Sequence, residues 1–398
     1  MSKSINIKKI IANILIVLIL LMLSLEMIYH YYANISYLQI NIIFSLLIVV
    51  LECVYLVLFN HSKINKWAFY LFLFVIYQVM ISIITKSTYF PKFYTDLFGW
   101  PLAILVFSDY FSKYDLSEKM GYVILIFLFL FVFISFYSIR KYLTRAGDYG
   151  GVIFYSTYSC ITLLPLTLMT VKNPVIRKIC ILLVSMISLL STKRGNLIAL
   201  VFGIIFYILV DIKVESNNKI KYKKMFKYIV LFILTIIFAY ILVEYSNLGI
   251  FVKLRKLSTD GGSDRLLIWQ FIIQKHKESS FLRRVFGHGF QSVYWVLKPL
   301  NITRFAHNSY IEYLYDYGYV GFIGLITFVV SLFKKLSTMI KDKFALSSYM
   351  VFTLIITVVF SLFSYLFEQS LVIMPIALTW GICIGRYNYN INNKKIGD

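Results

Sequence analysis

The chain is predicted to be an all-α polytopic membrane protein with about twelve transmembrane helices. Hydrophobic residues make up 60% of its 398 residues and charged residues only 15%, a balance that would expose too much apolar surface in water. Apolar segments of about the length of a membrane span recur along the chain. They fall near residues 8–29, 38–59, 67–85, 97–112, 120–139, 153–171, 176–190, 195–212, 228–246, 308–333, 346–366 and 371–386. Two of them, 97–112 and 176–190, are slightly short, which a tilt or a break in the helix would accommodate.

The distribution of lysine and arginine predicts the orientation, because loops rich in these residues are retained on the cytoplasmic side. With the amino terminus inside, 23 of the 40 basic residues fall in inner loops. These loops lie near residues 3–9, 63–66, 113–119, 172–178, 213–227, 334–343 and 386–395. Both termini are therefore predicted to be cytoplasmic, in a multi-pass protein of the cytoplasmic (inner) membrane. The same pattern accounts for most of the net charge of +22, so no nucleic-acid partner is predicted.

Several polar features inside the apolar segments need a separate interpretation. The first segment follows Lys8 and Lys9 without a small-residue cleavage site, so it is expected to be a retained span. The four cysteines fall within apolar segments and lack the spacing of metal ligands, so they are expected to be packing residues. Glu52 lies in the middle of a span. A carboxylate there is either functional or neutral and hydrogen-bonded between helices.

The chain divides into three predicted regions. Residues 1–244 hold transmembrane helices 1–9, residues 245–306 form one long outer loop, and residues 307–398 hold helices 10–12 and a cytoplasmic tail. The long loop carries ten basic and three acidic residues, a net of ten minus three, or +7. An anionic ligand is therefore expected at the outer face.

Two shorter outer turns, at residues 140–148 and 191–196, are also basic. Arg194 immediately precedes a span that runs from the outer to the inner face. That helix presents its free amino-terminal N–H groups and the positive end of its dipole outward, and arginine can bind phosphate oxygens through two donors at once. The alternative for any one of these arginines is a simple contact with a lipid phosphate.

A His-Asn pair, His307 and Asn308, opens the helix that follows the long loop. Counting about 20 residues back from Phe333 starts the apolar core near Leu314, which leaves His307 about 10 Å above it, at the level of the lipid headgroups. Histidine has an ordinary pKa near 6.5, so a neutral imidazole there can accept a proton. The alternative is a polar residue that only caps the helix or contacts the interface. Asn308 either orients the histidine or caps the helix, and Glu312 shares part of the same face.

Another histidine lies in the long loop, between two glycines. His288 is flanked by Gly287 and Gly289. This pattern is typical of a tight turn that needs the backbone freedom of glycine. His288 is therefore predicted to be structural.

Four motifs, in this order, resemble the O-antigen ligase and Wzy-type polymerase superfamily. They are Ser191-Thr-Lys-Arg194-Gly195, Asp264-Arg265-Leu-Leu-Ile-Trp269, Gly287-His288-Gly289-Phe290, and His307-Asn308-Ser-Tyr-Ile-Glu312 followed by Gly318 and Gly321. The resemblance covers roughly Arg140 to Gly324. Arg145-Ala-Gly147-Asp148 resembles a further family element, but the Asn-containing stretch that often follows it appears here as Ser156-Thr-Tyr-Ser159.

The resemblance implies a C-type glycosyltransferase-like fold and the transfer of a glycan from an undecaprenyl pyrophosphate carrier at the outer face. It implies that Arg194, Arg265 and Arg145 bind the pyrophosphate. His307 would activate the acceptor hydroxyl, supported by Asn308 and Glu312. No cofactor is implied and no metal is expected, since the chain has no Asp-x-Asp pair.

Three functions remain open. The first is a polymerase of O-antigen, capsule or exopolysaccharide, which moves a growing glycan onto the next lipid-linked repeat unit. The second is a ligase, which moves a finished glycan onto a lipid, wall or protein acceptor. The third is a flippase for lipid-linked oligosaccharides, against which the absence of two similar halves argues. The expected partners are an undecaprenyl-pyrophosphate-linked oligosaccharide and membrane lipids, with a chain-length regulator and a flippase as candidates.

Overall fold

The computed structural model describes most of the chain, and every regular element in the described part is a helix. The described residues are 2–31, 37–59, 66–87, 93–143, 153–191, 194–215, 222–223, 226, 265–300, 305–364, 366–367 and 369–397. The long helices are α1 (Ser2–Tyr31), α2 (Tyr37–Phe59), α3 (Lys66–Ile84), α4 (Phe93–Phe111), α5 (Glu118–Leu143), α6 (Ile153–Thr170), α7 (Pro174–Leu190), α8 (Arg194–Val214), α14 (Ser309–Lys341), α15 (Ser347–Phe363) and α16 (Ser370–Gly397).

These helices confirm an all-α membrane protein but not a count of twelve spans. Each apolar segment predicted from the sequence coincides with one of them, except 228–246, which lies outside the described residues. Parts of α1, α2, α5, α8 and α14 are long and apolar enough to cross a membrane. The apolar stretches of α3, α6 and α15 are shorter. Helix α14 also continues beyond Phe333, where the apolar core was expected to end, as far as Lys341.

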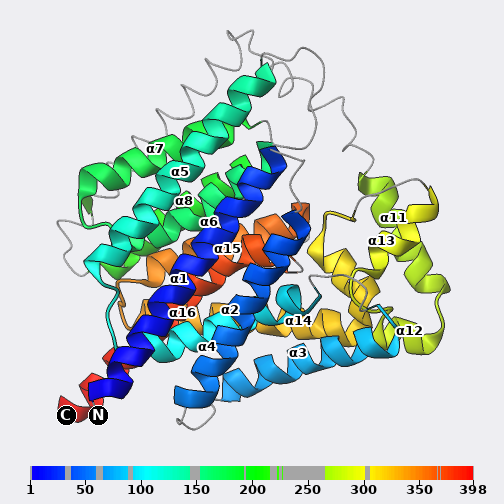
Figure 1. Ribbon diagram of the computed structural model, residues 1–398, viewed down its shortest axis with the longest axis horizontal. Coiled ribbons are helices and arrows are strands. Elements are labelled where there is room, and N and C mark those ends of the chain that lie inside the picture. Colours follow the sequence, from blue (N-terminus) through cyan, green and yellow to red (C-terminus); the bar gives the residue numbers. More distant parts are fainter. Residues whose placement is uncertain are drawn as a thin grey trace.

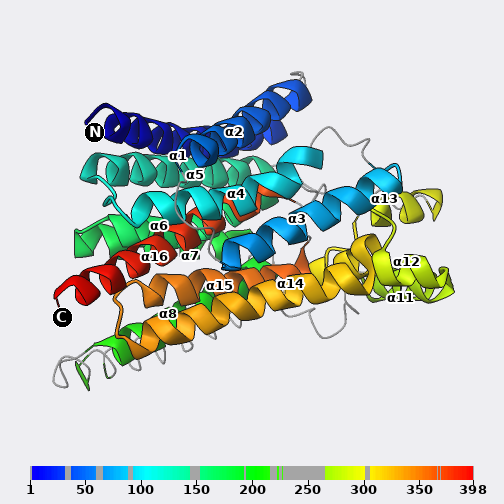
Figure 2. The ribbon, with the colours of Figure 1, turned by 90° about the horizontal axis from the view of Figure 1, so that it is seen from below.

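The long helices lie side by side and form a bundle (Figures 1 and 2). Both chain ends lie at one end of this bundle, which we call the terminal end. The opposite end, which we call the loop end, carries α11 (Arg265–Glu278), α12 (Phe281–Phe286) and α13 (Ser292–Leu297). The second half of the predicted outer loop therefore folds into helices.

Close approaches between helices hold the bundle together. A Cβ atom built on Gly381 of α16 would lie 2.7 Å from the Cβ of Phe107 in α4, and one on Gly385 would lie 2.6 Å from the carbonyl oxygen of Ser108. Only glycine lets the backbones of α4 and α16 come this close. Small residues at helix contacts have this role in membrane proteins, where packing replaces the hydrophobic drive for association.

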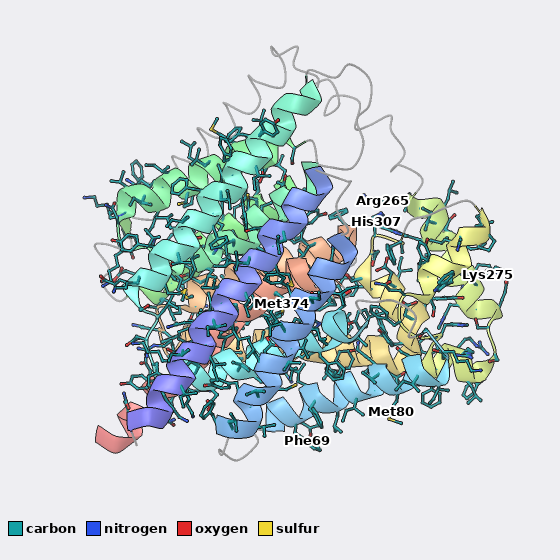
Figure 3. The ribbon with its side chains drawn as sticks, in the orientation of Figure 1. Phe69, Met80, Arg265, Lys275, His307 and Met374 are labelled. Atoms are coloured by element: carbon teal, nitrogen blue, oxygen red, sulfur yellow. The ribbon has the colours of Figure 1, made fainter. Side chains whose placement is uncertain are left out.

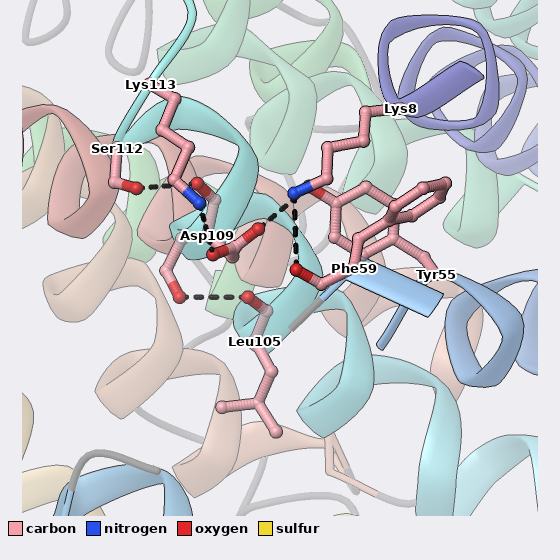
Figure 4. A network of polar contacts seen from close by, with 8 residues as sticks. Lys8, Tyr55, Phe59, Leu105, Asp109, Ser112 and Lys113 are labelled. Carbon is pink, nitrogen blue, oxygen red and sulfur yellow. Dashed lines mark hydrogen bonds and ion pairs between the residues drawn. The ribbon is translucent and has the colours of Figure 1, made fainter. Parts of the chain in front are cut away.

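Polar contacts join several helix ends at the terminal end. Figure 4 shows Lys8 donating to the carbonyl oxygen of Phe59 at 3.2 Å and Tyr55 donating to Asp109 at 3.0 Å. Lys113 forms an ion pair with Asp109 at 3.6 Å. Helices α1, α2 and α4 are therefore tied together where the sequence placed inner loops.

Two further pairs extend this set. Arg386 forms an ion pair with Asp115 at 2.7 Å, and Lys335 donates to Asn388 at 3.0 Å. The basic residues in both pairs were predicted to lie on the same side of the membrane as Lys8 and Lys113. These loops, which were predicted to lie on the same side of the membrane, therefore meet at the terminal end of the bundle.

Glu52 is completely buried within α2. Neither of its carboxylate oxygens has a hydrogen-bond partner in the described part of the chain. The predicted hydrogen bond between helices is therefore not found there.

Candidate functional site

The amino-terminal end of α8 lies against the carboxyl-terminal end of α15. A Cβ atom built on Gly195, in the first turn of α8, would lie 3.0 Å from the Cβ of Phe363, the last residue of α15. The start of the helix on which the sequence placed Arg194 therefore faces this point at the loop end. The side chain of Arg194 and the whole of Arg145 lie outside the described residues.

Arg265 reaches the same point from the loop-end helices. It is the first residue of α11, and its Nη1 donates to the carbonyl oxygen of Phe363 at 3.3 Å. The last carbonyl groups of a helix have no partner within the helix and carry partial negative charge. A guanidinium group at the end of α15 is therefore electrostatically favourable.

The segment that contains His307 is hydrogen-bonded to Ser364, the residue that follows α15. The backbone N–H and the hydroxyl of Ser309 both donate to the carbonyl oxygen of Ser364, at 3.0 and 2.9 Å. The N–H of Leu366 in turn donates to the Ser309 hydroxyl at 2.7 Å. These three bonds hold the start of α14 against the end of α15.

A further contact joins this segment to α11. The indole N–H of Trp269 donates to the carbonyl oxygen of Ala306 at 2.7 Å. Trp269 lies one turn along α11 from Arg265, so the helix that positions the guanidinium also positions the residue before His307. Figure 3 shows both Arg265 and His307 at the loop end of the bundle.

The cap of α14 determines the conformation of His307. Asn308 is the N-cap residue, and its side-chain oxygen accepts from the N–H groups of Tyr310 and Ile311 at 3.0 and 3.2 Å. Of the two alternatives for Asn308, the structure shows the helix cap. The helix begins at Ser309, so His307 precedes it. Its φ of +54° lies in the left-handed region that non-glycine residues seldom adopt.

Glu312 stabilises this unusual backbone. Its Oε1 accepts the backbone N–H of His307 at 3.1 Å, and its side chain is 1% exposed. A carboxylate that reaches back to an N–H before the helix is a variant of the capping box. Glu312 thereby stabilises the backbone conformation at His307.

The Gly287–Gly289 turn donates hydrogen bonds to α14 at the point where that helix is interrupted. Gly318 has φ +64° and ψ −167°, which interrupts the helix and frees backbone carbonyl groups. The N–H of His288 donates to the carbonyl of Tyr315 at 3.2 Å, and the N–H of Gly289 donates to that of Asp316 at 2.7 Å. The predicted tight turn is thus confirmed, with φ of +91° at Gly287 and +98° at Gly289.

His288 belongs to this turn and not to the set around Phe363. Its ring stacks on Tyr315 with centroids 4.3 Å apart, and its Nε2 lies 3.0 Å from the Ser279 hydroxyl. Burial, together with the nearby positive charge of Arg283, lowers the pKa of His288 to about 4. Its ring is therefore neutral at physiological pH and acts as a packing residue.

The sequence did not predict the hydrogen bonds that join α11 and α14 to the end of α15. Ser309 and Ser364 carried no signal beyond being polar, and Phe363 lies outside every motif. Gly318 offered the clearest clue, because a glycine inside a helical pattern often marks a kink. Within the described ranges, no group of three or more His, Cys, Asp or Glu side chains is placed to hold a metal ion.

Residues 179–326 match the family model described as O-antigen ligase. This match supports the resemblance to the O-antigen ligase and Wzy-type polymerase superfamily. The match covers less than half of the chain, from within α7 to within α14. It includes the start of α8, Arg265 and His307, the three elements that meet around Phe363. No curated protein sequence matches the chain. The match supports a glycan-processing role of the ligase or polymerase type.

Proposed function

We propose that the protein is a polysaccharide polymerase. It transfers a growing glycan from undecaprenyl pyrophosphate to the next lipid-linked repeat unit at the outer face of the cytoplasmic membrane. One observation carries this proposal: the start of α8, Arg265 and the His307 segment converge on Phe363 and Ser364. In this proposal, Arg265 and the start of α8 bind the pyrophosphate, and His307 is the proton acceptor.

The reaction needs both kinds of group. The oxygen of the acceptor hydroxyl forms a bond to the anomeric carbon of the donor sugar, and the bond between that carbon and the pyrophosphate oxygen breaks. The electron pair of the broken bond leaves with the lipid pyrophosphate. Arg265, the amino-terminal N–H groups of α8 and Arg194 stabilise the negative charge that develops there. The imidazole of His307 takes the proton of the hydroxyl.

The membrane orientation is part of the proposal. The loops that meet at the terminal end carry most of the inner set of basic residues, so the positive-inside rule assigns that end to the cytoplasm. The loop end then faces outward. The site at Phe363 lies where a lipid-linked donor would present its pyrophosphate.

The test uses the purified full-length protein in lipid, with a synthetic lipid-linked repeat unit as the only substrate. His307→Ala should lower the rate of elongation by about 10²–10⁴-fold, the usual contribution of general-base catalysis. Lys277→Ala, at an exposed position of α11, is the matched control and should retain the wild-type rate. Elongation by His307→Ala at a near wild-type rate would remove the histidine from the mechanism.

A ligase of the same family is the second candidate, supported by the family description. A deletion strain separates the two functions by the sizes of its glycans. Loss of a polymerase leaves single repeat units, whereas loss of a ligase leaves long chains on undecaprenyl pyrophosphate. Long lipid-linked chains in the deletion strain would contradict the polymerase proposal and favour the ligase.

A further inference from the structure

Helix α12 exposes large apolar side chains at the loop end of the bundle. Phe281 is 70% exposed, Leu282 65% and Phe286 42%. At about 100° per residue, these three positions fall within an arc of about 140° on one side of the helix. A compact apolar patch of this kind marks an interaction surface.

The length of α3 gives a first measure of the depth of α12 in the bilayer. From Lys66 to Ile84 this helix rises about 27 Å, close to the thickness of the hydrocarbon core of a bilayer. A Cβ atom on Gly289 would collide with Thr85 and Ser87, directly after α3. The turn that follows α12 therefore lies near the outer boundary of the hydrocarbon core.

An independent measure comes from α14. The helix rises about 24 Å over the 16 residues from Lys334, at the terminal end, to Gly318. A Cβ atom on Gly318 would collide with the carbonyl oxygen of Val285 and lie 2.6 Å from the N atom of Gly287. The carboxyl-terminal end of α12 therefore lies at the same level, within or just above the acyl chains.

The apolar side of α12 adjoins lipid-facing surface on its neighbour α3. Tyr77 of α3 donates to the carbonyl oxygen of Phe286 at 2.9 Å. One turn and two turns beyond Tyr77, Met80 and Ile84 are 54% and 67% exposed. Figure 1 shows α12 beside this end of α3. The exposed apolar surface is thus continuous from the span onto α12.

Two cationic side chains lie on the same short helix. Arg283 and Arg284 follow Phe281 and Leu282 directly, and both are half-buried. At about 100° per residue, both positions fall outside the arc of the apolar patch, and the Nη1 of Arg283 donates to the carbonyl oxygen of Gly287 at 3.4 Å. The apolar arc itself therefore holds no charged residue.

We infer that α12 is an interfacial helix. Its side chains Phe281, Leu282 and Phe286 insert into the outer leaflet. The helix anchors the loop-end helices to the bilayer surface. This inference requires that the bundle spans the membrane, and for the choice of leaflet it rests on the proposed orientation, but it stands or falls separately from the proposed transferase activity.

The test measures the environment of a spin label on α12 in the full-length protein. Cys53 is the exposed cysteine of the chain, whereas Cys160, Cys180 and Cys383 are buried. The label is therefore attached to Leu282→Cys in a Cys53→Ala background. The protein is reconstituted in nanodiscs of phosphatidylethanolamine and phosphatidylglycerol. Collision rates of the label with oxygen, which dissolves in lipid, and with a polar nickel chelate are compared.

Two matched positions calibrate the result. Ile83→Cys, at an exposed site of α3, reports lipid, and Lys277→Cys, at an exposed site of α11, reports water. The oxygen-to-nickel ratio at Leu282 should equal that at Ile83 within twofold and exceed that at Lys277 several-fold. A ratio like that at Lys277 would overturn the inference. Low collision rates with both reagents would also overturn it, because they would show that α12 packs against a second copy or another protein.

Discussion

At the scale of single residues, the backbone before α14 is held in a conformation that its sequence alone does not favour. His307 adopts φ +54°, and a non-glycine residue in a sparsely populated region costs on the order of 1–3 kcal/mol. The Asn308 cap and the bond from the N–H of His307 to Glu312 offset this cost. Strain held in this way is common where a side chain must point in one direction.

The first prediction concerns Glu312 as a positioning residue. Glu312→Gln keeps an oxygen that accepts the N–H of His307, so it should retain most activity. Glu312→Ala removes the acceptor and should lower kcat by about tenfold, the effect of losing about 1.4 kcal/mol. Initial rates over a range of acceptor concentrations measure this effect. Equal losses in both variants would show that the carboxylate has a role other than accepting this bond.

The second prediction concerns Arg265. Lysine keeps the charge but loses the planar fork that binds a pyrophosphate through two bonds. Arg265→Lys should therefore lower kcat/KM for the lipid-linked donor by about 10–100-fold, since a hydrogen bond to a charged group contributes about 1.5–3 kcal/mol. Arg386→Lys, whose ion pair with Asp115 lies at the terminal end, is the matched control. A loss of the same size in the control would point to general instability.

At the scale of elements, the break in α14 docks the loop-end helices onto the bundle. Tyr77 donates to the carbonyl oxygen of Tyr317 at 2.7 Å, next to the carbonyls of Tyr315 and Asp316 that the Gly287–Gly289 turn takes up. The side chain of Asp316 also accepts the N–H of Val293 at 3.0 Å. A continuous helix would use these carbonyls internally, so the break creates the docking surface.

The third prediction tests this break. Gly318→Ala adds a Cβ at φ +64° that collides with Val285, and the left-handed conformation alone costs about 1–2 kcal/mol for a residue with a side chain. The variant should melt at a lower temperature and lose protease protection of residues 281–300. Gly99→Ala is the control, because its Cβ would lie 3.5 Å from Met374 in ordinary contact. Equal melting temperatures for Gly318→Ala and wild type would contradict the proposed role of the break.

At the scale of the whole molecule, a neutral histidine links the loop-end helices to the bundle. His288 has a pKa lowered to about 4 by burial and by Arg283, below the value near 6.5 expected in an unfolded chain. Between these two values the undocked state binds more protons than the docked state. Docking is therefore most stable above about pH 6.5 and weakens as the pH falls towards 4.

The fourth prediction is that hydrogen exchange of residues 281–297 accelerates over this pH window, after correction for the intrinsic exchange rate. His288→Phe retains a ring to stack on Tyr315 but cannot titrate, so it should reduce the pH dependence. His276, whose pKa burial also lowers, should leave a residual slope. A pH dependence unchanged in His288→Phe would show that another group controls docking.

The sequence by itself determined the class of the protein, most of its helices and the position of His307 at the start of α14. These properties depend on local composition: apolar runs specify helices in a membrane, basic residues specify which loops share a side, and an Asn before a helix specifies a cap. The order of the motifs also indicated the resemblance that the match of residues 179–326 supports, because this order is a property of the chain and not of its folding.

The tertiary structure decided which of these residues meet. Arg265 and Phe363 are 98 residues apart in the chain, and Ser309 and Ser364 are 55 apart. Their contacts depend on the packing of α8, α14 and α15, for which no single segment carries a signal. Gly318 indicated a kink, but its sequence context did not reveal that the Gly287–Gly289 turn and Tyr77 donate to the carbonyls that the break frees. Local patterns specify elements, whereas a site built by long-range hydrogen bonds exists only after those elements have packed.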